Sequence, residues 1–180
     1  MIYRLNDEYS VRGLRESDLD GPYRSWFEDQ DICRFNSHAK FVRTDAHFRR
    51  YVQSLDGNEL VVWAICHASD GHIGNVSLQS LSFIDRSAEF AIIIGDRRHW
   101  RRGVGKLAAA RLLEHGFLKL NLNRIYCGTV ATNEGMKRLA LALGMQQEGV
   151  RRAHCFLDGQ WVDVVEFGML RSEFTSAQYR

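Results

Sequence analysis

A segment rich in arginine and glycine, Arg98 to Gly105, separates an apolar stretch of the chain from an alanine-rich one. Residues 89–95 before it are mainly apolar and β-branched, which predicts a buried strand. After it, apolar residues recur at the i, i+3, i+4 and i+7 spacing of one helix face. The first amides of a helix have no internal partner and attract phosphate groups. The segment therefore predicts a site for a phosphorylated ligand; the alternative is a solvated basic end of a helix.

Three classes of ligand use such a strand-turn-helix arrangement. A mononucleotide P-loop needs Gly five residues before its Gly-Lys pair and Ser or Thr after it, but Trp100 and Leu107 fill these places. Residues 103–108 fit the dinucleotide pattern G-x-G-x-x-A, yet residues 121–127 hold no acid that could bind a ribose. Coenzyme A is the third class, and the sequence around the glycines favours it.

The stretch Trp100 to Gly105 resembles the pyrophosphate-binding motif of the GNAT acetyltransferase superfamily, in the form of its RimJ/RimL-like branch. Residues 133–145 resemble the next segment of that family, an Asn-headed helix closed by Gly and an apolar residue, and residues 148–170 resemble its closing hairpin. The resemblance covers most of the chain from Asp70 onward. It implies an α/β (α+β) fold in which helices flank a mixed, mostly antiparallel sheet with a β-α-β coenzyme-binding core. It also implies acetyl-CoA as the acetyl donor. The length of the chain, its 45% hydrophobic content and the lack of a visible linker or internal repeat predict one domain over residues 1–180.

The resemblance further implies which groups bind the coenzyme. Related strands carry a bulge whose free amides face the thioester and the pantetheine arm. Arginines at the turn would pair with phosphates, and Asn133 would contact the coenzyme, cap its own helix, or do both. The predicted coenzyme-binding residues are Ile92, Ile93, Ile94, Arg98, Arg101, Arg102, Gly103, Val104, Gly105, Lys106 and Asn133.

Glu89, at the start of the strand that leads to the turn, is the predicted catalytic base. A primary amine has a reference pKa of about 10.4, so an attacking amine must lose a proton near neutral pH. The alternative is a carboxylate that only pairs with Arg86. In the family a Tyr or a Ser on the Asn-headed helix commonly protonates the leaving thiolate, but Ala140 and Met136 occupy those positions. Tyr126 is a substitute acid only if it is not a core residue, and no acid is assigned.

Two groups of polar side chains are candidates for binding the acceptor. One is the loop with Asn36, Ser37 and His38; the other is Asn75, Ser77 and Gln79, which alternate on one face of a predicted strand. These uncharged types suit hydroxyls and a ring-borne amine better than a polyamine. The predicted function is therefore acetyl transfer to a small-molecule amine such as an amino sugar. The alternatives are a protein N-terminus as the acceptor, or a non-catalytic acyl-CoA-binding module.

Composition limits the other possibilities. The net charge is only +2, which gives no reason to expect nucleic acid or a membrane as a partner. The four cysteines are far apart, with no C-x-x-C pair and no His at metal-ligand spacing, so we expect reduced thiols and no metal. No secretory signal or membrane span is visible, which predicts a cytoplasmic protein. A homodimer is expected only by analogy with the family.

The remaining patterns predict the elements that position these residues. Strands are expected at residues 9–15, 60–66, 73–83 and 124–130, with a closing hairpin that turns at Asp158-Gly159. Helices are expected after Thr44, after Asn133 and after Ser17-Asp18; for the last of these, Gly21-Pro22 marks an alternative, later start. Hairpins in the first half and a β-α-β crossover in the second imply a mixed sheet flanked by helices.

Overall fold

The computed structural model describes residues 2–36, 40–56 and 60–175 of the chain. Its strands are β1 (Ile2–Arg4), β2 (Tyr9–Gly13), β3 (Val61–His67), β4 (Gly71–Ser82), β5 (Ser87–Ile94), β6 (Arg124–Val130), β7 (Gln146–Leu157) and β8 (Gln160–Leu170). The α-helices are α1 (Asp45–Gln53), α2 (Val104–Leu118) and α3 (Glu134–Ala142). Short 3-10 helices are η1 (Glu16–Asp20), η2 (Ser25–Phe27), η4 (Ser54–Asp56), η5 (Arg97–His99) and η6 (Arg171–Glu173).

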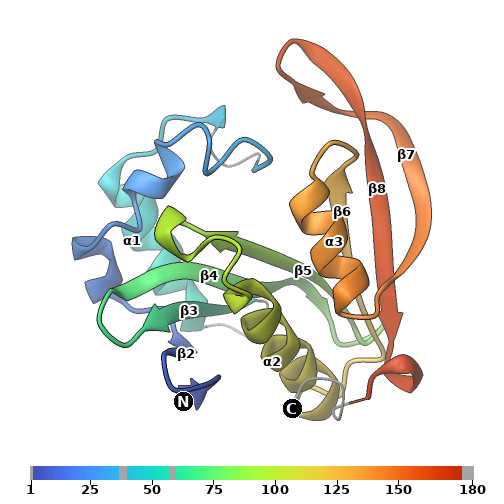
Figure 1. Cartoon of the computed structure of the whole chain (residues 1–180), viewed down its shortest axis with the longest axis horizontal. Coiled ribbons are helices and arrows are strands. Elements are labelled where there is room, and N and C mark those ends of the chain that lie inside the picture. Colours follow the sequence, from blue (N-terminus) through green and yellow to red (C-terminus); the bar gives the residue numbers. More distant parts are fainter. Residues whose placement is uncertain (1, 37–39, 57–59, 176–180) are drawn as a thin grey trace.

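The strands form one mixed sheet in the order β1-β2-β3-β4-β5-β6-β8-β7. Every neighbouring pair is antiparallel except β5 and β6, which are parallel and are joined through α2. The predicted mixed, mostly antiparallel sheet with one β-α-β crossover is confirmed. In Figure 1 the β7–β8 hairpin extends beyond the rest of the sheet.

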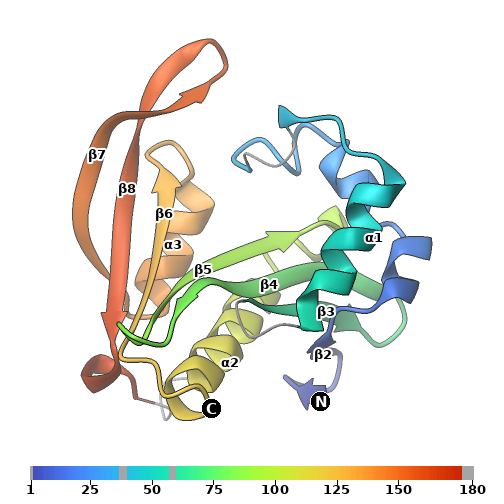
Figure 2. The same ribbon diagram turned by 180° about the vertical axis from the view of Figure 1, so that it is seen from behind.

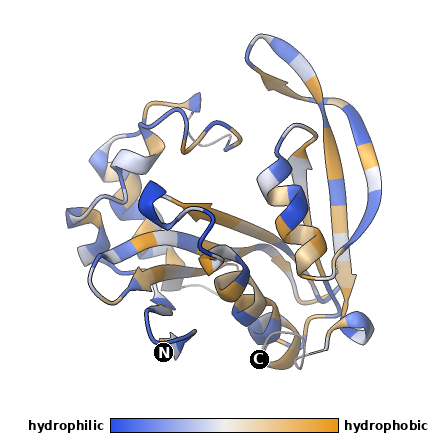
Figure 3. Cartoon of the chain, viewed as in Figure 1, coloured by the Kyte–Doolittle hydropathy of each residue, from blue (hydrophilic) through white to orange (hydrophobic). Residues whose placement is uncertain are grey.

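The helices cover both faces of the sheet. Helices α2 and α3 lie on the face seen in Figure 1, whereas α1 lies on the opposite face, seen in Figure 2. The main core joins α2 and α3 to the sheet; a Cβ on Gly116 of α2, for example, would be 3.0 Å from Leu78 of β4. Apolar residues follow the central strands and α2, and the β7–β8 hairpin is more mixed (Figure 3). A smaller aromatic cluster lies between η1, η2 and α1.

The predicted limits of most elements agree with the structure to within a few residues. The helix expected after Ser17-Asp18 is instead split into η1 and η2, on either side of Pro22. Proline lacks an amide hydrogen and disfavours the helical conformation of the residue before it, which explains the interruption at this point. Strand β1 was not predicted, because three residues are too short for a periodic pattern. None of the described helices is long and apolar enough to cross a membrane.

Candidate active site

The central feature of the candidate site is the point where β5 and β6 separate. The two parallel strands pair only at Ser87, Ala88 and Glu89, with Glu89 opposite Tyr126. Beyond that point the strands diverge, with α3 beside β6, as Figures 1 and 2 both show. The second half of β5 therefore has a free edge inside the sheet, where backbone groups are open to a ligand.

The free edge of β5 is not produced by the predicted bulge. The register of β5 with β4 is regular from Glu89 to Ile94, and the irregularity lies in β4 between Gln79 and Ser82. The expected bulge at residues 92–94 is therefore wrong. The indole of Trp100 donates a hydrogen bond to the Ile94 carbonyl over 2.8 Å. The N–H and C=O groups of every second residue of a strand point to the same edge. The amide of Ile92 therefore points to the same free edge as the carbonyl of Ile94.

The turn before α2 has the geometry expected of a pyrophosphate site. Gly103 is the N-cap, with a φ of 79° in the left-handed region, and a Cβ there would have no atom within 4 Å. The turn is therefore open on its outer side. Arg101 and Arg102 are exposed and, among the described residues, their side chains have no ion-pair or hydrogen-bond partner. The open helix end and two available guanidinium groups fit the phosphates of coenzyme A.

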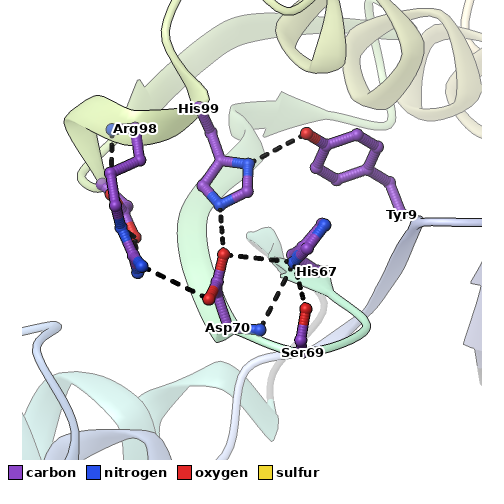
Figure 4. A network of polar contacts seen from close by, with 7 residues as sticks. Tyr9, His67, Ser69, Asp70, Arg98 and His99 are labelled. Atoms are coloured by element: carbon purple, nitrogen blue, oxygen red, sulfur yellow. Dashed lines mark hydrogen bonds and ion pairs between the residues drawn. The ribbon is translucent and has the colours of Figure 1, made fainter.

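Arg98 is already committed to other side chains. Its guanidinium pairs with Asp96 at 2.6 Å and with Asp70 at 3.3 Å. Figure 4 shows that Asp70 also lies between two histidines: its Oδ2 is 3.2 Å from His67 Nδ1 and 3.0 Å from His99 Nε2. The structure thus places Arg98 in a network that ties the β3–β4 turn to the segment before α2. A phosphate at Arg98 would have to compete with these carboxylates.

The ligand atoms of His67, Asp70 and His99 all lie within 4.8 Å of one another, which is close enough to hold a metal ion. Sequence spacing did not reveal this group because His99 is contributed by a distant segment. The Tyr9 hydroxyl lies 2.9 Å from the other ring nitrogen of His99, which is only 2% exposed. Each member thus has a polar partner from the protein itself.

Asn133 caps α3. Its side-chain oxygen accepts a hydrogen bond from the Met136 amide, and its amide group donates to the Thr129 hydroxyl over 3.0 Å. The oxygen therefore caps the helix as predicted, and the amide group ties the cap to β6.

Glu89 is half-buried and, among the described residues, has no hydrogen-bond or ion-pair partner. The alternative pairing with Arg86 is wrong, because the Arg86 guanidinium binds Asn121 instead. Burial raises the pKa of the Glu89 carboxyl, the negative charge of Glu166 adds to the rise, and Arg151 opposes it. A raised pKa makes this carboxylate a better proton acceptor than an exposed one.

The charges that act on Glu89 come from the β7–β8 hairpin. Glu166 and Arg151 form an ion pair at 2.5 Å, located over Gly128 of β6. A Cβ at residue 128 would be 2.7 Å from the Glu166 carboxylate and 3.0 Å from the Arg151 guanidinium. The missing side chain at Gly128 thus makes room for the ion pair on the same face of the sheet as Glu89. The sequence carried no sign of this arrangement.

A cavity of about 210 Å³ lies between α1 and the sheet on the Glu89 face. Its floor is made by the predicted acceptor residues Asn75, Ser77 and Gln79 together with residues 91–93 of β5. Gln79 is paired with Glu89 across β4 and β5, so Glu89 lies at one end of this floor. Of the predicted loop, Asn36 also lines the cavity, whereas Ser37 and His38 lie outside the described residues.

The opposite wall of the cavity was not predicted. It consists of Tyr23, Phe27, Arg43, His47, Phe48 and Tyr51. Val62 of β3 pairs with Ser77 of β4 and, with Leu60 just before it, belongs to the sheet side of the cavity. The sequence predicted helical segments after Ser17-Asp18 and after Thr44, but not that their side chains line a cavity. The segment before α1 also reaches the β7–β8 hairpin, through an Arg34–Asp158 ion pair at 3.2 Å and a hydrogen bond from Lys40 to the Phe156 carbonyl.

Residues 10–146 match the family model of the acetyltransferase (GNAT) domain. This chain belongs to the GNAT family. The N-acetyltransferase p20 of Bacillus licheniformis is 31% identical over 93% of this chain and 96% of its own. The spermidine N(1)-acetyltransferase of Vibrio cholerae is 28% identical over 96% and 87%. Among solved structures, RimL, an acetyltransferase of a ribosomal protein with coenzyme A bound, has a TM-score of 0.85 at 15% identity and covers 94% of this chain and 98% of its own.

The GNAT chain is therefore an N-acetyltransferase that uses acetyl-CoA as its cosubstrate, which confirms the predicted enzyme class and coenzyme. The likeness to RimL shows the fold alone. The RimJ/RimL-like branch and the identity of the acceptor stay predictions.

In this GNAT chain the positions of the usual acids contain apolar side chains. Ala140 is fully buried, and Met136 packs against the main core. Tyr126, paired with Glu89 in the sheet, is only partly buried, and Arg124 lies over its ring at 5.8 Å. The Tyr126 side chain is therefore partly accessible beside Glu89 rather than enclosed in the core.

Proposed function

We propose that this acetyltransferase moves the acetyl group of acetyl-CoA directly to the primary amine of a small molecule, with Glu89 as the general base. The amine nitrogen forms a bond to the acetyl carbonyl carbon, the carbon–sulfur bond breaks, and the amine proton passes to the Glu89 carboxylate. Coenzyme A leaves as a thiolate, whose reference pKa of about 8.5 allows departure with little help from an acid. A departing thiolate needs no acid at positions 140 and 136, where this chain has the apolar residues Ala140 and Met136.

The single observation that carries the proposal is the position of Glu89. Its carboxylate has no partner among the described residues, its pKa is raised by burial, and it stands where β5 and β6 part. An unpaired, half-buried acid costs stability and is rarely kept without a use. The free edge of β5 at Ile92 and the open turn at Gly103 would bind the coenzyme on one side of it.

The cavity supports a small-molecule acceptor. Asn75, Ser77 and Gln79 offer amide and hydroxyl groups that suit the hydroxyls of an amino sugar. A protein N-terminus is the second candidate, favoured by the resemblance to the RimJ/RimL-like branch. Such an acceptor would have to enter the cavity beside α1 as an extended chain.

Thermal unfolding of the purified chain with acetyl-CoA, coenzyme A and NAD tests the coenzyme site, because a ligand that binds only the native state raises its stability. We expect a rise with both forms of coenzyme A and none with NAD. Glu89→Gln should lower kcat/KM by about a hundredfold or more while the Kd for acetyl-CoA stays the same. Glu8→Gln, at an exposed position in the β1–β2 turn, is the matched control. If the Glu89→Gln variant keeps the kcat/KM of the wild type, Glu89 is not the general base.

A further inference from the structure

The cavity between α1 and the sheet contains a positive side chain, and none of its described lining residues is Asp or Glu. We propose that the acceptor carries an anionic group, bound by Arg43, at the end of the cavity away from Glu89. The inference rests on the proposed function and narrows it to a class of acceptor. That class is a primary amine on a ring or apolar body with a carboxylate or phosphate several bonds away.

The charge of Arg43 acts inside the cavity. Its guanidinium donates a hydrogen bond to the His47 ring, which therefore acts as an acceptor. Burial raises the pKa of the Tyr23 hydroxyl, and the positive charge of Arg43 works against this rise. The field of Arg43 thus reaches Tyr23 on the cavity wall. A second cation would be repelled here, and an anion would be attracted.

Apart from Glu89, two described acids on the elements around the cavity, Asp45 and Asp18, are bound elsewhere. Asp45, at the start of α1, pairs with Arg24 at 2.5 Å. Asp18 accepts two hydrogen bonds from the Arg12 guanidinium, over 2.6 and 2.8 Å. These carboxylates are not free to bind a polyamine.

Aromatic rings can also bind a cation through their faces, so the aromatic wall needs a separate argument. The ring of Tyr23 is edge to face with those of Phe27 and Phe48, at centroid distances of 5.3 and 5.9 Å. Ring faces that are packed against ring edges are not available to an ammonium group. These three rings therefore offer mainly apolar contact to the body of the acceptor.

The length of the cavity floor sets the distance between the amine and the anionic group of the acceptor. Gln79 pairs with Glu89 at one end, and Asn75 pairs with Ile93 at the other, where Tyr23 also lines the cavity. Four residues of antiparallel strand span about 14 Å. The amine near Glu89 and the anion near Arg43 are therefore separated by several bonds, unlike the groups of an α-amino acid.

The inference is tested with pairs of amines that differ by one anion. Benzylamine is compared with 4-(aminomethyl)benzoate, and glucosamine with glucosamine 6-phosphate, by measuring the release of the coenzyme A thiol from acetyl-CoA. The first pair tests a carboxylate and the second a phosphate, while spermidine is the polycationic comparison. The variants are Arg43→Gln and its matched control Arg49→Gln, an exposed arginine in α1 that does not line the cavity.

We expect kcat/KM for one anionic amine to exceed that of its neutral partner by about tenfold or more. Arg43→Gln should abolish the difference through KM, and Arg49→Gln should keep it. Equal rates within both pairs, no turnover of either anionic amine, preference for spermidine, or an unchanged anion preference in Arg43→Gln would each overturn the inference. Failure to bind acetyl-CoA, or full activity in Glu89→Gln, would instead contradict the proposed function.

Discussion

The indole ring of Trp26 lies directly against the backbone of Gly95. A Cβ at residue 95 would be only 1.9 Å from Cδ2 of Trp26, which leaves no space for any side chain. Trp26 is 3% exposed and belongs to the aromatic cluster beside α1, whereas Gly95 immediately follows β5. The contact thus fixes the cavity wall relative to the strand that carries Glu89.

Replacement of Gly95 by alanine should therefore force Trp26 out of its position. Overpacking of this kind typically costs about 1–3 kcal/mol, and we expect the free energy of unfolding to fall by about 2 kcal/mol. Urea unfolding of the wild type and of Gly95→Ala measures the change. Gly13→Ala is the control, because a Cβ at residue 13 has no atom within 4 Å. Equal stability of the two variants would show that the Trp26 contact is not restrictive.

The Arg151–Glu166 ion pair on the β7–β8 hairpin should influence the pH dependence of kcat/KM through the pKa of Glu89. If Glu89 is the base, kcat/KM falls as the pH drops through its raised pKa. Glu166→Gln removes a negative charge, so the pKa of Glu89 should fall and the acid limb should move to lower pH. Arg151→Gln leaves Glu166 unopposed, so the limb should move to higher pH.

The pH dependence of kcat/KM in the two hairpin variants provides the measurement. Opposite displacements are the expected signature, because a general loss of structure would not move the two limbs in opposite directions. Displacements in the same direction, or none, would show that the acid limb does not report Glu89.

The arginines at the turn before α2 should differ in their effect on coenzyme binding. Arg101 and Arg102 have side chains without a partner among the described residues, whereas Arg98 is held by Asp96 and Asp70. We expect Arg101→Gln and Arg102→Gln each to raise the Kd for acetyl-CoA by up to about fivefold. Arg98→Gln is the internal control and should stay within about twofold of the wild type.

Isothermal titration at low and at moderate salt measures these affinities. Salt screens exposed charges, so the differences between the variants should shrink as ionic strength rises. If Arg98→Gln loses as much affinity for acetyl-CoA as Arg101→Gln does, Arg98 exchanges its carboxylate partners for a phosphate when the coenzyme binds.

The elements that were predicted correctly are those with a local signal. The β-branched run before the glycines and the apolar periodicity after them both lie within a single segment, and Thr44 caps α1 through its hydroxyl as its position suggested. At Pro22 the local signals disagree. Ser17 and Asp18 favour the start of a helix, whereas Pro22 interrupts it, and the segment forms two short 3-10 helices.

The parts of the site that could not be predicted depend on tertiary packing. Arg43 and Tyr23 meet at the cavity only because α1 and η2 fold onto the same face of the sheet. Glu166 acts on Glu89 from a hairpin far along the chain, and no spacing rule connects the two. The histidine–aspartate group around Asp70 escaped detection for the same reason.

The cluster of His67, Asp70 and His99 should keep its structure without a metal ion. Oδ1 of Asp70 lies 3.3 Å from the Arg98 guanidinium, and Oδ2 is shared between His67 and His99. Because Arg98 already supplies a positive charge, a divalent ion would gain little there. We expect dialysis against EDTA, or addition of zinc, to leave the Tm unchanged. A zinc-dependent rise in Tm that disappears in His67→Ala would reveal a metal site instead.

The ion pair between Arg12 and Asp18 should contribute stability that is lost in acid. Burial raises the pKa of Asp18, but hydrogen bonds from the Arg12 guanidinium and the Arg15 amide outweigh it, so the pKa lies below its usual value. A carboxylate with a lowered pKa stabilises the fold fully above its unfolded pKa of about 3.9, and this contribution disappears as the pH falls through the folded value.

Asp18→Asn should therefore lower the free energy of unfolding by about 3 kcal/mol at pH 7, because it leaves a largely buried arginine without a charged partner. Below about pH 4 the difference from the wild type should shrink, since the native carboxyl is then losing its charge as well. Asp45→Asn is the control: its side chain is 72% exposed, and its pair with Arg24 should contribute less than about 1 kcal/mol. A pH-independent difference between wild type and Asp18→Asn would attribute the loss to packing rather than to charge.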